Sequence, residues 1–244
     1  MFLFKASKRL LPISLGFILL AWTTAVGACP KIFSESGTKS PAKGSGIRSP
    51  NKQVLAWSVA VLEKDPEVIR GQLILRNERT ARQEIVFNTK IRAGKVLSSH
   101  PDLSDANYNI FCIVDWSPDS NYLLLQEILG HLYSDVWNDY YWIYDRLRRQ
   151  SMVIDLKSLK QAIERYWQKK GLDFRDISYQ AVAIGWRGDK FNSVVFEAFT
   201  FHHEPLIFLG TWSVAPTGQK PRLLAEKEEE IVVKHFGQVV NRPE

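Results

Sequence analysis

Short apolar runs separated by polar turns dominate the chain from residue 53 onward. The runs are rich in Val, Ile, Phe, Tyr and Trp, which pack well on a pleated sheet, and turn-forming residues bound them. This pattern predicts strands near 54–62, 71–76, 84–90, 110–116, 121–128, 140–145, 151–155, 179–186, 193–200, 206–214 and 221–225. Short strands at close spacing predict one antiparallel all-β domain over residues 53–244.

One segment, 156–170, departs from the strand pattern. Its apolar residues lie at helical spacing: Leu156, Leu159, Ile163, Tyr166 and Trp167. Asp155 is placed to cap the N-terminus of a helix, and Gly171 is placed to stop it. The sequence therefore predicts one amphipathic helix, which we expect to pack on the sheet.

Three of the apolar runs that contain a tryptophan form a degenerate repeat. They read "AWSVAVL" around Trp57, "DWSPDSNYLLL" around Trp116 and "GWRGDKFNSVVF" around Trp186. In the last two, a tight turn places Asp119 or Asp189 three residues after the tryptophan, before another strand. Pro and Asp at such positions form turns, and a Trp at a strand end packs between sheets. We therefore interpret these five residues as scaffold.

The three segments resemble the WD40-like repeat of TolB-type and prolyl-oligopeptidase-type β-propellers, whose blades often carry a "W-S-P-D-G-x-x-L" hairpin. The resemblance covers roughly residues 54–225 and is closest at 116–125, where Ser120 stands at the usual Gly. It implies about three blade-like units, whereas closed propellers typically have about four to eight blades. The expected fold is thus an open or incomplete propeller, or one completed by a second copy of the chain. The alternative fold is a β-sandwich.

The N-terminus has the pattern of an export signal. Lys5, Lys8 and Arg9 precede an apolar stretch, 10–22, that is shorter than the roughly 20 residues of a membrane-spanning helix. We predict a signal peptide over residues 1–28. The sequence "VGAC", ending at Cys29, resembles the lipobox of bacterial lipoproteins, which implies acylation of Cys29 and a membrane anchor. Cleavage after Ala28 without acylation, or retention of the segment as an anchor, are the alternatives.

The chain has only two cysteines, Cys29 and Cys112. If Cys29 is acylated, Cys112 is a lone thiol in the apolar run "NIFCIV", and we favour this interpretation because buried free cysteines behave as small hydrophobes. If Cys29 is not acylated, an exported compartment would permit a disulfide between the two. Residues 29–52 are rich in Ser, Gly, Pro and Lys, which predicts a flexible linker.

The formal net charge is +6, and the signal segment contributes three positive charges and no negative one. The mature chain keeps +3, which is too mild to indicate nucleic-acid binding, and export argues further against it. The membrane surface and another envelope protein are the expected partners.

Few residues suggest chemistry. His202, His203 and Glu204 are the weak candidates for a metal or polar site, but adjacent histidines in a strand point to opposite faces. No second His pair or Cys pair accompanies them, and no nucleophile elbow, Walker loop or dinucleotide fingerprint is present. We predict neither a catalytic residue nor a cofactor. In the aromatic segment 133–145, Tyr133 and Trp137 precede the core of the strand and are the candidate interface residues.

The sequence thus favours a non-enzymatic, exported binding protein of the bacterial envelope. The competing hypothesis is an extracytoplasmic hydrolase, directed at glycans or dependent on a metal, that uses His202 or His203.

Overall fold

Strands make up most of the described residues, and a single helix interrupts them there. The structure, a computed structural model, describes residues 28–30, 42–62, 68–88, 106, 108–131, 137–175, 177–188, 193–200, 206–227 and 235–240. The strands are β1 (Ala42–Lys43), β2 (Gly46–Arg48), β3 (Val54–Leu62), β4 (Ile69–Asn77), β5 (Gln83–Asn88), β6 (Tyr108–Trp116), β7 (Tyr122–Gly130), β8 (Trp137–Asp145), β9 (Gln150–Val153), β10 (Tyr179–Trp186), β11 (Val194–Thr200), β12 (Phe208–Val214), β13 (Arg222–Ala225) and β14 (Gln238–Val240), and the helix is α3 (Lys157–Gln168). Each predicted strand range overlaps one of these strands, and the prediction of a mostly antiparallel β fold with one helix is confirmed.

The first sheet has ten strands and forks at β4. Its main path runs β14-β2-β3-β4-β6-β7-β8-β9, while β1 pairs with β3 and β5 pairs with β4. β4 meets β6 in parallel only at Ile69 and Tyr108, and further along it pairs with β5 instead. The sheet therefore splits into a β1–β5 layer and a β6–β9 layer that face each other.

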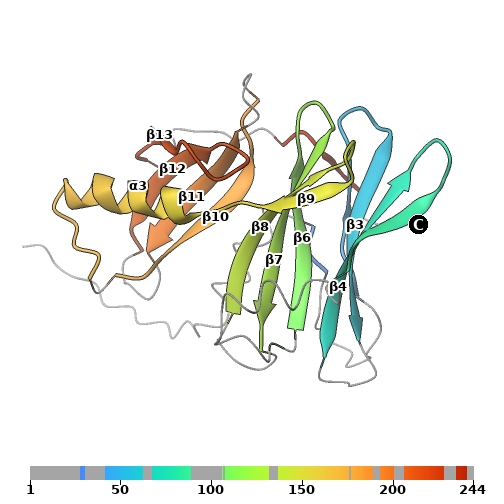
Figure 1. Cartoon of the computed structure of the whole chain (residues 1–244), viewed down its shortest axis with the longest axis horizontal. Helices are drawn as coiled ribbons and strands as arrows, with labels where there is room; N and C mark the ends of the chain where they lie inside the picture. Colours follow the sequence, from blue (N-terminus) through green and yellow to red (C-terminus); the bar gives the residue numbers. More distant parts are fainter. Residues whose placement is uncertain are drawn as a thin grey trace, which may run out of the picture.

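The second sheet is a four-stranded antiparallel meander in the order β10-β11-β12-β13. β6 to β9 form a meander of the same kind within the first sheet, and α3 connects the two meanders (Figure 1). The described strands form two open sheets and no closed ring.

The β6–β9 layer is the middle layer, because it lies between the β1–β5 layer and the second sheet. Successive side chains along its strands point alternately into two cores. Leu123 and Leu125 of β7 enter the core shared with β3 and β4, whereas Leu124 between them enters the core shared with the second sheet and α3. In the same way Trp142 faces one core and Tyr141 the other. The aromatic strand β8 therefore packs on both of its faces.

The helix lies against the second sheet (Figure 1). Leu159 and Ile163 are fully buried, and the Trp167 indole donates to the Leu209 carbonyl at 2.8 Å. Asp155 accepts from the Lys157 N–H at 2.9 Å, one residue before the N-cap, and Gly171 follows the helix with φ +91°. A left-handed residue at that place ends a helix, as predicted.

The predicted flexible linker is wrong for residues 42–48. β1 and β2 both pair with β3, and Ile47 of β2 is buried. The C-terminal strand β14 then pairs with β2, so that the two ends of the domain meet in one sheet. The strand pairing, which the local composition does not reveal, overrides the disorder tendency of the Ser- and Lys-rich segment.

Candidate binding surface

Four turns meet at one end of the first sheet. They are residues 49–53, 78–82, 117–121 and 146–149. The register requires this convergence, because β4 and β6 run parallel and each neighbouring pair is antiparallel. The turns lie in the upper part of the view in Figure 1. We call this surface the turn end.

Hydrogen bonds from main-chain N–H groups join two of the other turns to the segment 49–53. The Asn51 N–H donates to the Ser120 hydroxyl at 3.1 Å, and the Glu78 N–H donates to the Gln53 carbonyl at 2.8 Å. The fourth turn is tied in on the other side, because the Arg146 N–H donates to the Asn121 carbonyl at 2.9 Å. The turn end is therefore one connected surface.

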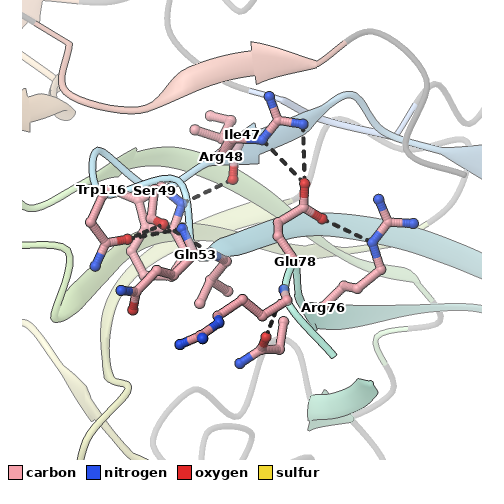
Figure 2. Close-up of polar contacts among 11 residues, drawn as sticks. Ile47, Arg48, Ser49, Gln53, Arg76, Glu78 and Trp116 are labelled. Carbon is pink, nitrogen blue, oxygen red and sulfur yellow. Dashed lines mark hydrogen bonds and ion pairs between the residues drawn. The ribbon is translucent and has the colours of Figure 1, made fainter. Parts of the chain in front are cut away.

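Two arginines share one glutamate at this end, as Figure 2 shows. Arg48 of β2 donates from Nε and Nη2 to Glu78 Oε2, at 3.3 and 3.1 Å, and Arg76 of β4 donates to Oε1 at 3.0 Å. The carboxylate thus accepts a forked pair on one oxygen and a third bond on the other. Arg149 also lies 3.8 Å from Glu84 of β5.

Basic side chains outnumber carboxylates at the turn end. The basic residues are Arg48, Lys52, Arg76, Arg79, Arg82, Arg146, Arg148 and Arg149, and the carboxylates are Glu78, Glu84, Asp119 and Asp145. Lys52, Arg79 and Arg82 are exposed and have no ion-pair partner among the described residues. The surface therefore carries uncompensated positive charge on a framework that hydrogen bonds hold in place.

Apolar side chains border this charge. Leu147 is 68% exposed at the tip of the turn between β8 and β9, and Ile85 is 57% exposed on β5. Met152 and Val153 on the edge strand β9 are also exposed. Cationic and apolar side chains side by side are typical of surfaces that bind another protein.

The Ser-Pro-Asp turn itself is a structural device. Asp119 accepts from the Ser117 hydroxyl at 2.6 Å and from the backbone and side-chain nitrogens of Asn121 at 3.1 and 3.0 Å. Partial burial raises the pKa of Asp119, but these hydrogen bonds outweigh it and hold the pKa below its usual value. Ser120 has φ +63°, so it takes the left-handed conformation for which the propeller repeats use Gly.

Asp115, directly before Trp116, anchors the C-terminal segment. It is 1% exposed and accepts from the backbone N–H groups of Phe236 and Gly237 at 3.0 and 2.8 Å. His235 Nδ1 lies 3.8 Å from the same carboxylate, and the nearby Asp115 carboxylate raises the pKa of His235. The sequence offers no local signal for this anchoring role, since the two N–H donors lie 121 and 122 residues further along the chain.

Trp116 and Trp186 are fixed at the same junction. The Trp116 indole donates to the Ile47 carbonyl of β2 at 2.9 Å (Figure 2), and the Trp186 indole donates to the Asp115 carbonyl at 3.3 Å. Both tryptophans and Trp57 of β3 are buried. None of the three is available to a ligand.

A second aspartate, Asp139 of β8, is half-buried between the first and second sheets. Gln180 of β10 donates to it, and Gln126 of β7 also hydrogen-bonds to it. Burial raises the pKa of Asp139 to about 6 despite these bonds. Its charge adds to burial in raising the pKa of Tyr108 to about 12. This cluster holds a carboxylate, amides and phenols, but no nucleophile with an adjacent base.

Another buried carboxylate, Glu127, is matched by neutral donors. The Trp142 indole donates to it at 2.6 Å, and the Asn109 amide also donates to it. Burial, with the charge of Glu127 second, raises the pKa of Tyr140 to about 12. The two donors and the carboxylate lie on the neighbouring strands β6, β7 and β8, which indicates a structural polar network inside the core.

The cysteines correct the prediction of a lone Cys112 thiol. Cys29 and Cys112 form a disulfide, with their Cα atoms 4.3 Å apart. A sulfur in a disulfide cannot also carry a thioether-linked lipid, so the bond and the predicted lipidation of Cys29 exclude each other. This is the second of the two alternatives that the cysteine count left open.

Several predicted site residues lie outside the described residues: Tyr133, Asp189, His202, His203 and Glu204. Trp137 begins β8, and its side chain is likewise outside. The described part of the chain holds no cluster of three metal-ligating side chains, and no helix in it is long and apolar enough to cross a membrane.

No protein-family model matches the chain, and no curated protein sequence matches it.

Proposed function

We propose that the chain is a non-enzymatic, exported binding protein of a bacterial envelope, and that its turn end docks an acidic segment of a partner protein. The observation that carries the proposal is the uncompensated charge of Lys52, Arg79 and Arg82 on interlinked turns. Opposite charge steers the encounter of two proteins and selects among partners. The export part rests on the signal pattern and on the disulfide, since disulfides persist in oxidising compartments.

The rigidity of the turn end supports a role in binding. Binding costs less conformational entropy when the surface is already ordered, and here neighbouring turns fix one another. The shared Glu78 holds Arg48 and Arg76 side by side, and Leu147 adds an apolar contact at the rim. An acidic segment with an occasional apolar residue has the complementary chemistry.

The layered architecture supports the proposal of a blade-like scaffold. Three layers stack face to face, two of them contain a four-stranded meander, and the first strand of each meander ends in a buried Trp. We propose that these layers correspond to the blades of an incomplete propeller. The pairing of β14 with β2 joins the chain ends, as closing strands do in repeat folds.

The proposal is tested with an oligo-glutamate peptide as the probe. We expect the protein to bind the peptide with an affinity that falls as salt rises, measured by fluorescence anisotropy. The double variant Arg79→Glu/Arg82→Glu should bind about tenfold or more weakly. The matched control, Lys157→Glu/Lys160→Glu on exposed positions of α3, makes the same change of net charge on another surface and should bind like the wild type.

Two outcomes would overturn the proposal. Equal loss in both variants would mean that net charge alone drives binding. Stronger binding to vesicles of anionic phospholipid, abolished by the same arginine changes, would put a membrane in place of a protein partner. The competing hydrolase hypothesis would need His202 or His203 beside a carboxylate in a pocket, and replacing both histidines should leave peptide binding unchanged if the binding proposal is right.

A further inference from the structure

Residues 28–30 are built into the core of the first sheet. The Ala28 N–H donates to the Ile113 carbonyl at 2.9 Å, and the Ile113 N–H donates to the Ala28 carbonyl at 3.2 Å. The Ser58 hydroxyl of β3 donates to the same Ala28 carbonyl at 3.4 Å. Ala28 is 5% exposed, and Pro30 is buried as well. This pairing gives the segment a fixed place between β3 and β6.

The neighbouring residues leave no room at this point. A Cβ atom on Gly44 would lie 3.1 Å from the Pro30 nitrogen and 3.0 Å from the Ser58 hydroxyl oxygen. The Cys29 side chain packs against the buried cluster of Ala60, Ile69, Ile110 and Cys112. The disulfide to Cys112 therefore crosses from the N-terminal segment into the interior.

We propose that the mature protein keeps Ala28 and that Cys29 is permanently bonded to Cys112, so that the export signal is removed on the N-terminal side of Ala28 and Cys29 is never acylated. The bond forms when the two thiols lose two protons and two electrons to the disulfide of an oxidising thiol–disulfide exchange protein, which leaves as a dithiol. This inference is independent of what the turn end binds.

Cleavage between Ala28 and Cys29 would damage the site. It would remove the donor and the acceptor that satisfy the backbone of Ile113, which is fully buried, and one partner of the buried Ser58. It would also create a charged amino group on Cys29 beside an apolar cluster. Both lipoprotein processing and simple cleavage after Ala28 make this cut, so the structure opposes both.

Mass spectrometry of the protein purified from the envelope decides the question. The full-length chain is expressed in a bacterial host with export and digested without reduction. We expect an N-terminal peptide that contains Ala28, joined through Cys29 to the peptide that contains Cys112, and no alkylation of either cysteine before reduction. A chain that begins at Cys29, with or without lipid, would overturn the proposal, and so would a Cys112 thiol that alkylates without reduction.

Matched variants give a second readout. Under the proposal, Cys29→Ala and Cys112→Ala each leave one free thiol, lower the melting temperature by similar amounts, and leave the partition between detergent and water unchanged. If Cys29 were acylated, the two variants would differ: only Cys29→Ala would move the protein from the detergent phase to water. If a variant fails to fold, the peptide masses of the wild type still decide between the two.

Discussion

Asp115 of β6 and Asp139 of β8 lie in the same β6–β9 layer with β7 between their strands, yet their surroundings differ. Asp115 stands at the turn end and accepts from the N–H groups of Trp116, Phe236 and Gly237, which are fixed by the main chain. Asp139 stands near the start of β8, at the opposite end, and its donors are the flexible amides of Gln126 and Gln180. Main-chain donors hold the Asp115 carboxylate in one place, whereas the two side-chain amides around Asp139 do not offset its loss of water.

The surroundings of Asp139 raise its pKa. Burial is the largest influence on it and raises the pKa to about 6, so the neutral acid is favoured in the folded protein. Asp115 is instead the point where the two sheets and the C-terminal segment meet, through its carboxylate and its carbonyl. Asp115 therefore holds the fold together, and Asp139 makes it sensitive to protons.

The largest expected effect is that of Asp115→Ala. The change leaves the Phe236 and Gly237 N–H groups without their acceptor, and we expect a loss of about 3 kcal/mol in the free energy of unfolding. Urea denaturation followed by tryptophan fluorescence measures it. Asp119→Ala, which removes only local turn bonds, is the control and should cost about 1 kcal/mol. Equal losses in the two variants would refute the special role of Asp115, and Asp115→Asn extends the test if the alanine variant does not fold.

Asp139→Asn should have the opposite sign at neutral pH. A carboxyl group whose pKa is raised in the folded state stabilises the fold fully only below its unfolded pKa, and it loses that contribution as the pH rises through about 6. The variant removes the half-buried charge, so we expect it to be more stable than the wild type by about 1 to 3 kcal/mol at pH 8. Unfolding at pH 4 and pH 8 checks this.

The control for Asp139 is Asp173→Asn at an exposed position, where the Arg175 side chain holds the pKa of the aspartate low. That variant should not gain stability between pH 4 and pH 8. If Asp139→Asn lowers stability at pH 8, the charged carboxylate of Asp139 is stabilised in the fold by more than its two amide donors. That result would contradict the difference between Asp139 and Asp115.

The strands and the helix could be predicted from the sequence because their signals are local. Alternation of apolar residues marks β6 to β8, and the spacing from Leu156 to Trp167 marks α3. The anchoring role of Asp115 could not be predicted, because its partners Phe236 and Gly237 lie 121 and 122 residues away. The disulfide joins cysteines that are 83 residues apart, and the sequence left it as one of two alternatives without deciding between them.

The turn end shows a similar limit. Each basic turn is visible in the sequence, as in "RNERTARQ" and "RLRR", but only the register of β3 to β9 brings them to one end. The sequence did not predict β2, because a short strand with one buried side chain, that of Ile47, gives almost no periodic signal. Local patterns thus predicted the elements, and long-range pairing determined the surface.

His235 should give a smaller, pH-dependent effect at the Asp115 anchor. The nearby Asp115 carboxylate raises the pKa of His235, so the contribution of the charged imidazole is complete below about 6.5 and is lost as the pH rises through the folded-state pKa. Because the side chain is 43% exposed, solvent screens the pair. We expect His235→Gln to flatten the dependence of stability on pH above 6.5 by less than about 1 kcal/mol. An unchanged slope in thermal melts from pH 6 to pH 9 would contradict the pairing.

The smallest effect is expected for Ser120→Gly, which restores the residue of the propeller repeat. Glycine relieves the left-handed backbone of Ser120, a conformation that costs other residues about 1 to 2 kcal/mol, but it increases the entropy of the unfolded chain by about 0.4 to 1 kcal/mol. It also removes the hydroxyl that accepts from the Asn51 N–H and joins two turns. These opposing terms should leave the free energy of unfolding within about 1 kcal/mol of the wild type. A clear gain in stability would mean that the bond from the Asn51 N–H contributes little to holding the turns together.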